Sequence, residues 1–134
     1  MKILNLTCHT ATSGQIAAGV VEFTSHERFE RLLSLLKFDT APSELLVKSR
    51  TMAIVALAME EIDFQSKGQE VGYDEWQVML GGALWLMKPL TDGFMRSRVV
   101  PVFAFSERKS LETPLANGTV QKVVVFEHAG WVKA

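Results

Sequence analysis

The sequence predicts an α/β fold, in which a layered, mostly parallel sheet carries a β-hairpin at its edge near the C terminus. Short β-compatible segments alternate with segments whose apolar residues recur at helical spacing. Residues 99–105 are continuously apolar, as in a strand buried on both faces of a parallel sheet. The pair Asn117-Gly118 between two extended segments is a hairpin turn signal.

The chain is expected to begin with a strand, a loop and a short helix. Residues 2–7 start with β-compatible apolar side chains, and a polar loop follows them. Thr12 or Ser13 can cap a short helix over residues 15–18. That helix should end near Gly19, because glycine readily adopts the left-handed conformation of helix ends.

Two longer helices are expected next. Thr24 and Glu27 have the spacing of a capping box, which predicts the start of a helix over residues 25–37. Pro42 predicts the start of a helix over residues 43–62, because proline lacks an N–H that the first helical turn leaves unbonded. This second helix is apolar on almost all sides, so the sheet and another helix, or another subunit, must cover it.

The second half of the chain predicts a loop, a strand, a helix, a strand and the hairpin. Residues 65–75 are polar and predict the loop, and residues 76–80 predict the strand. In the helix that follows, Pro89 should cause a kink or mark a second start. With the strand over residues 99–105, this order predicts one Rossmann-like domain over residues 1–134.

Composition excludes several classes of protein. The chain has 134 residues and is 48% hydrophobic, which is enough for a core. Its 14 basic and 15 acidic residues provide no extended nucleic-acid surface. A single cysteine cannot form an internal disulfide, and the longest uncharged apolar block, 52–59, is too short for a membrane span. We therefore expect a cytoplasmic protein without membrane contact. The three histidines lack short ligand spacing, so we expect no metal or cofactor.

Three loop segments that follow strands, residues 7–10, 81–82 and 106–110, should meet at the carboxyl edge of the sheet, where open α/β sheets bind ligands. Paired glycines let an anion approach backbone N–H groups at a helix start, and the guanidinium of Arg108 suits phosphate or carboxylate. His9 is the candidate catalytic acid or base. The pattern predicts binding of a nucleotide-like or other anionic small molecule, with its hydrolysis left open. The predicted ligand-binding residues are Thr7, Thr10, Gly81, Gly82, Ser106, Arg108 and Ser110.

Each of these signals has a simpler interpretation. Gly81-Gly82 is equally consistent with a plain tight turn, since glycine suits a tight turn as well as the close approach of an anion to the backbone. The imidazole of His9 can bond the neighbouring backbone, and Arg108 can be a solvated loop charge. Cys8 is expected to be a small buried residue, because adjacent residues on an extended chain point to opposite sides.

Four segments carry a resemblance to known proteins. They are Ile3-Leu-Asn-Leu-Thr-Cys-His9, Met79-Leu-Gly81-Gly82-Ala, Phe103-Ala-Phe-Ser106-Glu-Arg108-Lys-Ser110 and Val124-Val-Phe-Glu-His128-Ala-Gly130-Trp. Together they resemble a family of small, mostly uncharacterised bacterial, plasmid and phage proteins.

The segment Leu4-Asn-Leu-Thr-x-His9 is also similar to the first strand and loop of small CRISPR-associated Rossmann-like proteins of ring-nuclease type. Some of these proteins bind or cleave cyclic oligoadenylates. The resemblance implies that His9, Thr10, Ser106 and Arg108 grip ring phosphates and that the protein is a two-fold homodimer.

The alternative hypothesis is a non-enzymatic interaction or inhibitor protein of a mobile genetic element. The apolar helix over residues 43–62 and the hairpin would then form the partner surface. Trp85 or Trp131, with Met87, would be the anchors, because aromatic residues are enriched at binding hot spots. The same helix can equally be part of the core.

Overall fold

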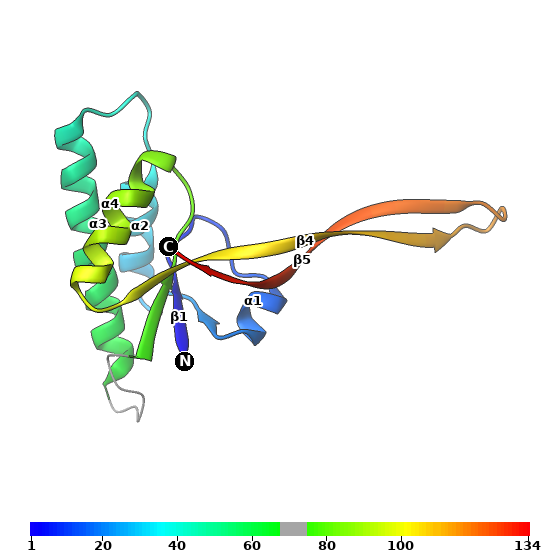
Figure 1. Ribbon diagram of the computed structural model, residues 1–134, viewed down its shortest axis with the longest axis horizontal. Helices are drawn as coiled ribbons and strands as arrows, with labels where there is room; N and C mark the ends of the chain where they lie inside the picture. Colours follow the sequence, from blue (N-terminus) through cyan, green and yellow to red (C-terminus); the bar gives the residue numbers. More distant parts are fainter. Residues whose placement is uncertain (68–74) are drawn as a thin grey trace.

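The computed structural model describes residues 1–67 and 75–134 and has a mixed α/β fold, as the sequence predicts (Figure 1). Strands and helices alternate through most of the chain, and two long strands end it. The elements are β1 (Lys2–Asn5), α1 (Ser13–Ala17), β2 (Val20–Val21), α2 (His26–Leu36), α3 (Glu44–Ser66), β3 (Trp76–Met79), α4 (Leu84–Arg96), β4 (Val100–Pro114) and β5 (Val120–Lys133).

The described strands form one five-stranded sheet in the order β2-β1-β3-β4-β5. The pairs β2/β1, β1/β3 and β3/β4 are parallel, and β4/β5 is antiparallel. The parallel middle and antiparallel edge are therefore as expected. The sequence analysis missed β2, because two residues are too few to show an alternating pattern; Val20 pairs with Ile3.

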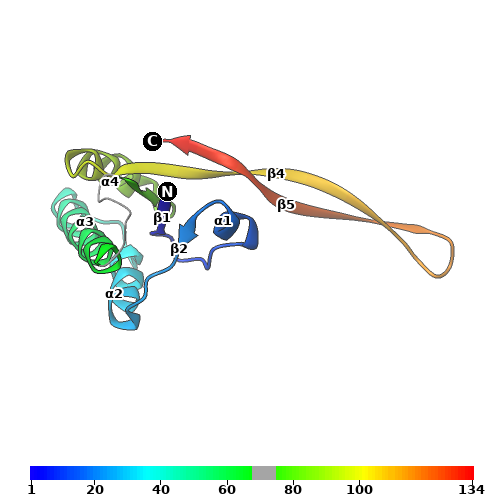
Figure 2. The same ribbon diagram turned by 90° about the horizontal axis from the view of Figure 1, so that it is seen from below.

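The two faces of the sheet are covered differently. Leu4 and Val78 face a large core that α2, α3 and α4 complete, and these three helices lie together on one side of the sheet (Figures 1 and 2). The neighbouring residues Ile3 and Met79 face the other side, as strand alternation requires. There a smaller cluster includes Ala11, with Trp131 of β5 packed against it.

The start of α2 differs from the predicted one. Ser25, not Thr24, is the N-cap, and its hydroxyl accepts a hydrogen bond from the backbone N–H of Arg28 at 3.2 Å. Thr24 instead donates from its hydroxyl and its backbone N–H to Oε2 of Glu61, at 2.8 and 3.2 Å. A capping-box pattern cannot reveal this, because Glu61 lies on another helix.

Helix α3 begins after its N-cap Ser43, close to the predicted position, but continues to Ser66 rather than ending near Ile62. Glu61 is therefore not at the negative end of the helix dipole. Gln65 and Ser66, which we expected in a loop, belong to α3, and residues 68–74 of that predicted loop lie outside the described residues.

Helix α4 is one continuous helix with Pro89 in its interior, so Pro89 does not mark the start of a second helix. None of the described helices is both long and apolar enough to cross a membrane.

The largest departure from prediction is in β4. We expected a strand over residues 99–105, a loop that begins at Ser106, and then a hairpin formed by a segment up to Leu115 and residues 119–126. Instead β4 is one strand that continues to Pro114 and pairs with β5 from Val102 onward. A bulge between Phe105 and Ser106 marks the place where the two strands leave the body. We call residues 106–114 and 120–128 the β-arm; it projects far from the rest of the molecule (Figures 1 and 2).

Candidate functional site

A pocket of about 280 Å³ lies at the carboxyl edge of the sheet, between the segments that follow β1 and β3. We call it the strand-end pocket. It brings together five of the predicted site residues, Thr7, His9, Thr10, Gly81 and Gly82. The remaining lining residues are Cys8, Thr12, Gln15, Met79, Leu80, Phe103 and Ala104.

The buried side chain of Asn5 shapes the loop on one side of this pocket. Its Oδ1 accepts hydrogen bonds from the backbone N–H and the hydroxyl of Thr7, at 2.9 and 2.7 Å. Its Nδ2 donates to the backbone oxygen of His9 at 2.8 Å and to Oε1 of Glu22 at 2.9 Å. Because both ends of this amide are used, the position of the loop is tied to the last residue of β1.

Thr7 makes contacts within the protein that the sequence did not predict. Its hydroxyl is engaged within the loop, with Asn5 and with the backbone N–H of His9 at 3.2 Å. Its methyl group packs against Gly81, where an added Cβ would lie 3.0 Å from Cγ2 of Thr7. The loops after β1 and β3 thus approach closely because residue 81 has no side chain, whereas Gly82 has a φ of +110° that favours glycine.

A Gly81→Ala substitution should lower the free energy of unfolding by about 1–2 kcal/mol, since the new methyl forces the two loops apart. Denaturant unfolding followed by circular dichroism would measure the change. In a Thr7→Ser background the hydroxyl stays and the clashing methyl is gone, so the same substitution should cost clearly less. An equal cost in both backgrounds would contradict the proposed contact.

The start of α4 adds an electrostatic feature beside Gly82. Its N-cap is Ala83, which provides no side-chain hydrogen bond, and the first turn contains no acidic residue. The partial positive charge of the helix N terminus is therefore not compensated by side chains of its own first turn. Sequence pattern had indicated this helix start but not its missing cap.

Cys8 and His9 both line the pocket and both are exposed. The expectation that Cys8 is buried was wrong, because the loop turns around Asn5 and its residues no longer alternate as in an extended strand. The backbone groups of His9 bond to Asn5 and Thr7, whereas its ring is carried on an exposed side chain.

The third predicted segment does not reach the pocket. Ser106, Arg108 and Ser110 are exposed residues of the β-arm. Strand β4 contributes only Phe103 and Ala104 to the lining, and no described lining residue is lysine or arginine. The loop expected after residue 105 is absent because β5 pairs with β4 along its whole extension, so these side chains are carried away from the sheet edge.

His128 is a neighbour of the site that the sequence analysis left aside. Its ring lies 4.6 Å from that of Trp131, and its Cβ is 3.2 Å from a Cβ placed on Gly14. Its Nδ1 is buried without a hydrogen-bond partner among the described residues. The side chain thus packs on α1, whose N-cap Thr12 and third residue Gln15 line the pocket.

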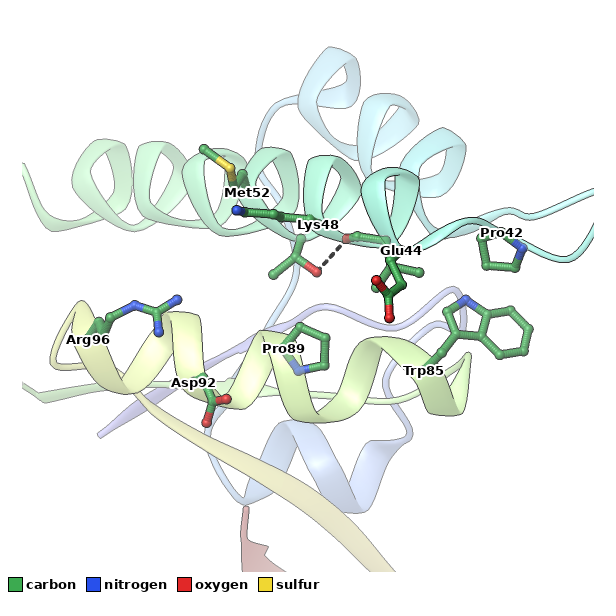
Figure 3. A pocket seen from close by; sticks show the side chains of 10 residues that line it. Pro42, Glu44, Lys48, Met52, Trp85, Pro89, Asp92 and Arg96 are labelled. Carbon is green, nitrogen blue, oxygen red and sulfur yellow. Dashed lines mark hydrogen bonds between the residues drawn. The ribbon is translucent and has the colours of Figure 1, made fainter.

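A second, larger cavity of about 830 Å³ lies between α3 and α4 (Figure 3). We call it the α3–α4 groove. Its lining includes Lys48 and Met52 of α3 and Pro89 and Arg96 of α4. Trp85, at one end, is half exposed and makes an edge-on contact with Phe38 at 5.5 Å between ring centroids. The sequence analysis had named Trp85 as an anchor but had not predicted a groove.

Residues 1–67 and 75–134 contain no group of three or more His, Cys, Asp or Glu side chains that could hold a metal ion.

The fold and these two cavities define a small α/β protein with a strand-end pocket and a projecting β-arm. The chain belongs to the family described as the uncharacterized protein MJ1673 family, whose model matches residues 1–132. The match covers nearly the whole chain, in agreement with the predicted membership of an uncharacterised family. Neither the curated proteins nor the solved structures gave a match.

Proposed function

We propose that this protein is a Rossmann-like α/β protein that binds a nucleotide-like or other anionic small molecule in the strand-end pocket. The observation that carries the proposal is that the segments after β1 and β3 line one pocket at the carboxyl edge of parallel strands. This is the place where open α/β sheets bind ligands.

The chemistry of the lining supports an anion held by hydrogen bonds rather than by an ion pair. Thr10 and Thr12 bring hydroxyl groups, and the glycines before α4 expose backbone at an uncapped helix start. None of the described residues that line the pocket is a lysine or arginine, so a single phosphate or carboxylate group fits better than a densely charged ligand. His9 is the acid or base candidate if the bound molecule is also hydrolysed.

The size of the pocket narrows the ligand further. At about 280 Å³ it lies at or below the lower end of cavities that enclose a drug-sized ligand, roughly 300–1,000 Å³. A small group such as a phosphate with its sugar is therefore the part of a nucleotide that we expect this pocket to hold. A cyclic oligonucleotide would therefore need a second contact surface, and we include in the proposal the two-fold homodimer that the resemblance implies.

Calorimetric titration with mononucleotides, cyclic dinucleotides and cyclic oligoadenylates tests the proposal. We expect saturable binding of at least one of them. Thr10→Val should weaken it by about 1.5–3 kcal/mol, which is roughly ten- to a hundred-fold, if this hydroxyl bonds a charged group. Arg108→Ala is the matched control, because Arg108 lies on the β-arm and should leave the affinity unchanged. A folded protein that binds none of these ligands would refute the proposal.

The α3–α4 groove supports a second candidate function, that of an interaction or inhibitor protein of a mobile genetic element. The half-exposed Trp85 at its end is the kind of anchor found in protein interfaces. The other two anchors of this hypothesis have less free surface, since Trp131 packs on the sheet and Met87 on the helical core. The ligand titration separates the two functions, because a protein that binds its partner at the α3–α4 groove does not need a ligand in the strand-end pocket.

A further inference from the structure

The β-arm exposes more apolar surface than a free two-stranded ribbon tolerates. Phe126 is 73% exposed, Leu111 51% and Val124 42%. In the arm the two strands pair with each other, and no third described strand adjoins either of them. An isolated two-stranded hairpin is only marginally stable in water, and three or more strands are usually needed. The arm therefore has the properties of a surface that a further strand completes.

The two edges of the arm are unlike. The backbone N–H of Leu115 donates to the oxygen of Thr119 at 2.8 Å, which fixes the alternation of hydrogen-bonded pairs along the arm. The even-numbered residues of both strands then point their backbone groups outward. On β4 this edge carries Arg108, Glu112 and Pro114, and charges and proline are the features that protect an edge strand.

The β5 edge lacks this protection. Its outward backbone groups belong to Val120, Lys122, Val124 and Phe126, and three of these four residues are apolar. The apolar run over residues 123–126 lies at the middle of this edge. An exposed apolar edge of this kind is a template for pairing with another strand.

We propose that β5 of one molecule pairs antiparallel with β5 of a second copy, through residues 120–128 and about a two-fold axis. The charges at the ends of the apolar run favour this arrangement. Lys122 precedes the run and Glu127 follows it, so an antiparallel pair places the two copies of each charged residue at opposite ends of the interface. A parallel pair in register would align Lys122 with Lys122 and Glu127 with Glu127.

A two-fold pair also brings together the residues of the β5 edge whose backbone groups point outward. Rotation about an axis perpendicular to the sheet preserves its faces, so even-numbered residues of one β5 lie opposite even-numbered residues of the other. These are the residues whose backbone groups point outward. Each pair of arms then becomes a four-stranded ribbon that continues the sheet of both molecules, and the interface is closed rather than open-ended.

The overall charge of the arm favours a protein partner over a polyanion. Three basic residues, Arg108, Lys109 and Lys122, are balanced by three acidic residues, Glu107, Glu112 and Glu127. The arm is therefore neutral and provides no field that would attract nucleic acid or an anionic membrane. A second copy of this chain, which carries the same neutral ribbon, meets no electrostatic barrier.

Size-exclusion chromatography with light scattering tests this inference. The wild type should have twice the chain mass of 14.9 kDa. Val124→Pro removes an outward N–H of the β5 edge and should give a monomer. Ser110→Pro is the matched control, because Ser110 lies directly opposite Val124 on the β4 edge, and it should remain a dimer. A monomeric wild type, open-ended fibres or a dimer that survives Val124→Pro would overturn the proposal.

If both proline variants are monomeric, the prolines could have disrupted the fold of the arm rather than the interface. Two lysine variants, at the same two positions, distinguish these explanations. Val124→Lys places like charges near the two-fold axis and should give a monomer, whereas Ser110→Lys should stay dimeric; a dimeric Val124→Lys overturns the proposal. The inference extends the homodimer of the proposed function but rests on the arm alone. Ligand titration of the monomeric variant distinguishes a failure of this inference from a failure of the proposed function, since none of the described residues that line the strand-end pocket belongs to the β5 edge.

Discussion

An Arg28→Met substitution is expected to lower the free energy of unfolding by about 3–5 kcal/mol, because it leaves the carboxylate of Glu61 buried without its cation. Glu61 is fully buried in the helical layer. Nε of Arg28 lies 2.9 Å from its Oε1, and Thr24 and Gln65 donate to its Oε2. A charge in such surroundings is tolerable only while all these partners are present.

The same group makes stability depend on pH. Burial alone would raise the pKa of Glu61, but the hydrogen bonds from Gln65, Arg28 and Thr24 outweigh burial and hold the pKa below its ordinary value of 4.5. The stability contributed by the carboxylate is therefore complete above pH 4.5 and is lost as the pH falls through the lower pKa of the folded state. The difference in free energy of unfolding between wild type and Arg28→Met should therefore decrease as the pH falls through this range.

Urea unfolding at a series of pH values would measure both effects. Arg31→Met is the matched control, since Arg31 is an exposed arginine on the same helix and should change stability by less than about 0.5 kcal/mol. Adding Glu61→Gln to Arg28→Met removes the buried charge and should restore part of the loss. An Arg28→Met variant as stable as the Arg31→Met control would show that the pair contributes nothing.

An Asn5→Ala substitution is expected to lower the free energy of unfolding by about 3 kcal/mol and to abolish the proposed ligand binding in the strand-end pocket. The side chain of Asn5 takes part in four hydrogen bonds, to Thr7, His9 and Glu22. Each contributes about 1 kcal/mol, and buried groups left without a partner add to the cost. The loop that carries Thr7, His9 and Thr10 would lose its anchor to β1.

Asn117 provides an unusually close control. Its Oδ1 accepts hydrogen bonds from the backbone N–H and the hydroxyl of Thr119, at 3.1 and 2.6 Å, which is the arrangement that Asn5 makes with Thr7. Asn117 is exposed at the tip of the β-arm, so Asn117→Ala should cost less than about 1 kcal/mol. Thermal unfolding and the ligand titration would compare the two variants, and equal losses would contradict the anchoring role of Asn5.

Much of the fold could be predicted because periodicity reflects local structure. Apolar spacing indicated the helices α2, α3 and α4, and the glycine pair marked the end of β3. Ligand-binding predictions on Thr10, Gly81 and Gly82 remain predictions, but the two segments that carry them do lie at one pocket. The expected placement of Ser106, Arg108 and Ser110 beside this pocket was wrong, because nothing local distinguishes a loop from a strand whose partner lies more than ten residues further along the chain.

The sequence by itself determined most of the elements and their order, β2 excepted, and the two strand ends that meet at the pocket, because these follow from local periodicity and from the geometry of parallel strands. Only the tertiary structure decided the partner of Glu61, the anchoring of the pocket loop by Asn5 and the extension of β4 into the β-arm. Each of these depends on contacts between residues distant in the chain. Such contacts are selected by the free energy of the whole packed molecule and leave no mark at fixed spacing in the sequence.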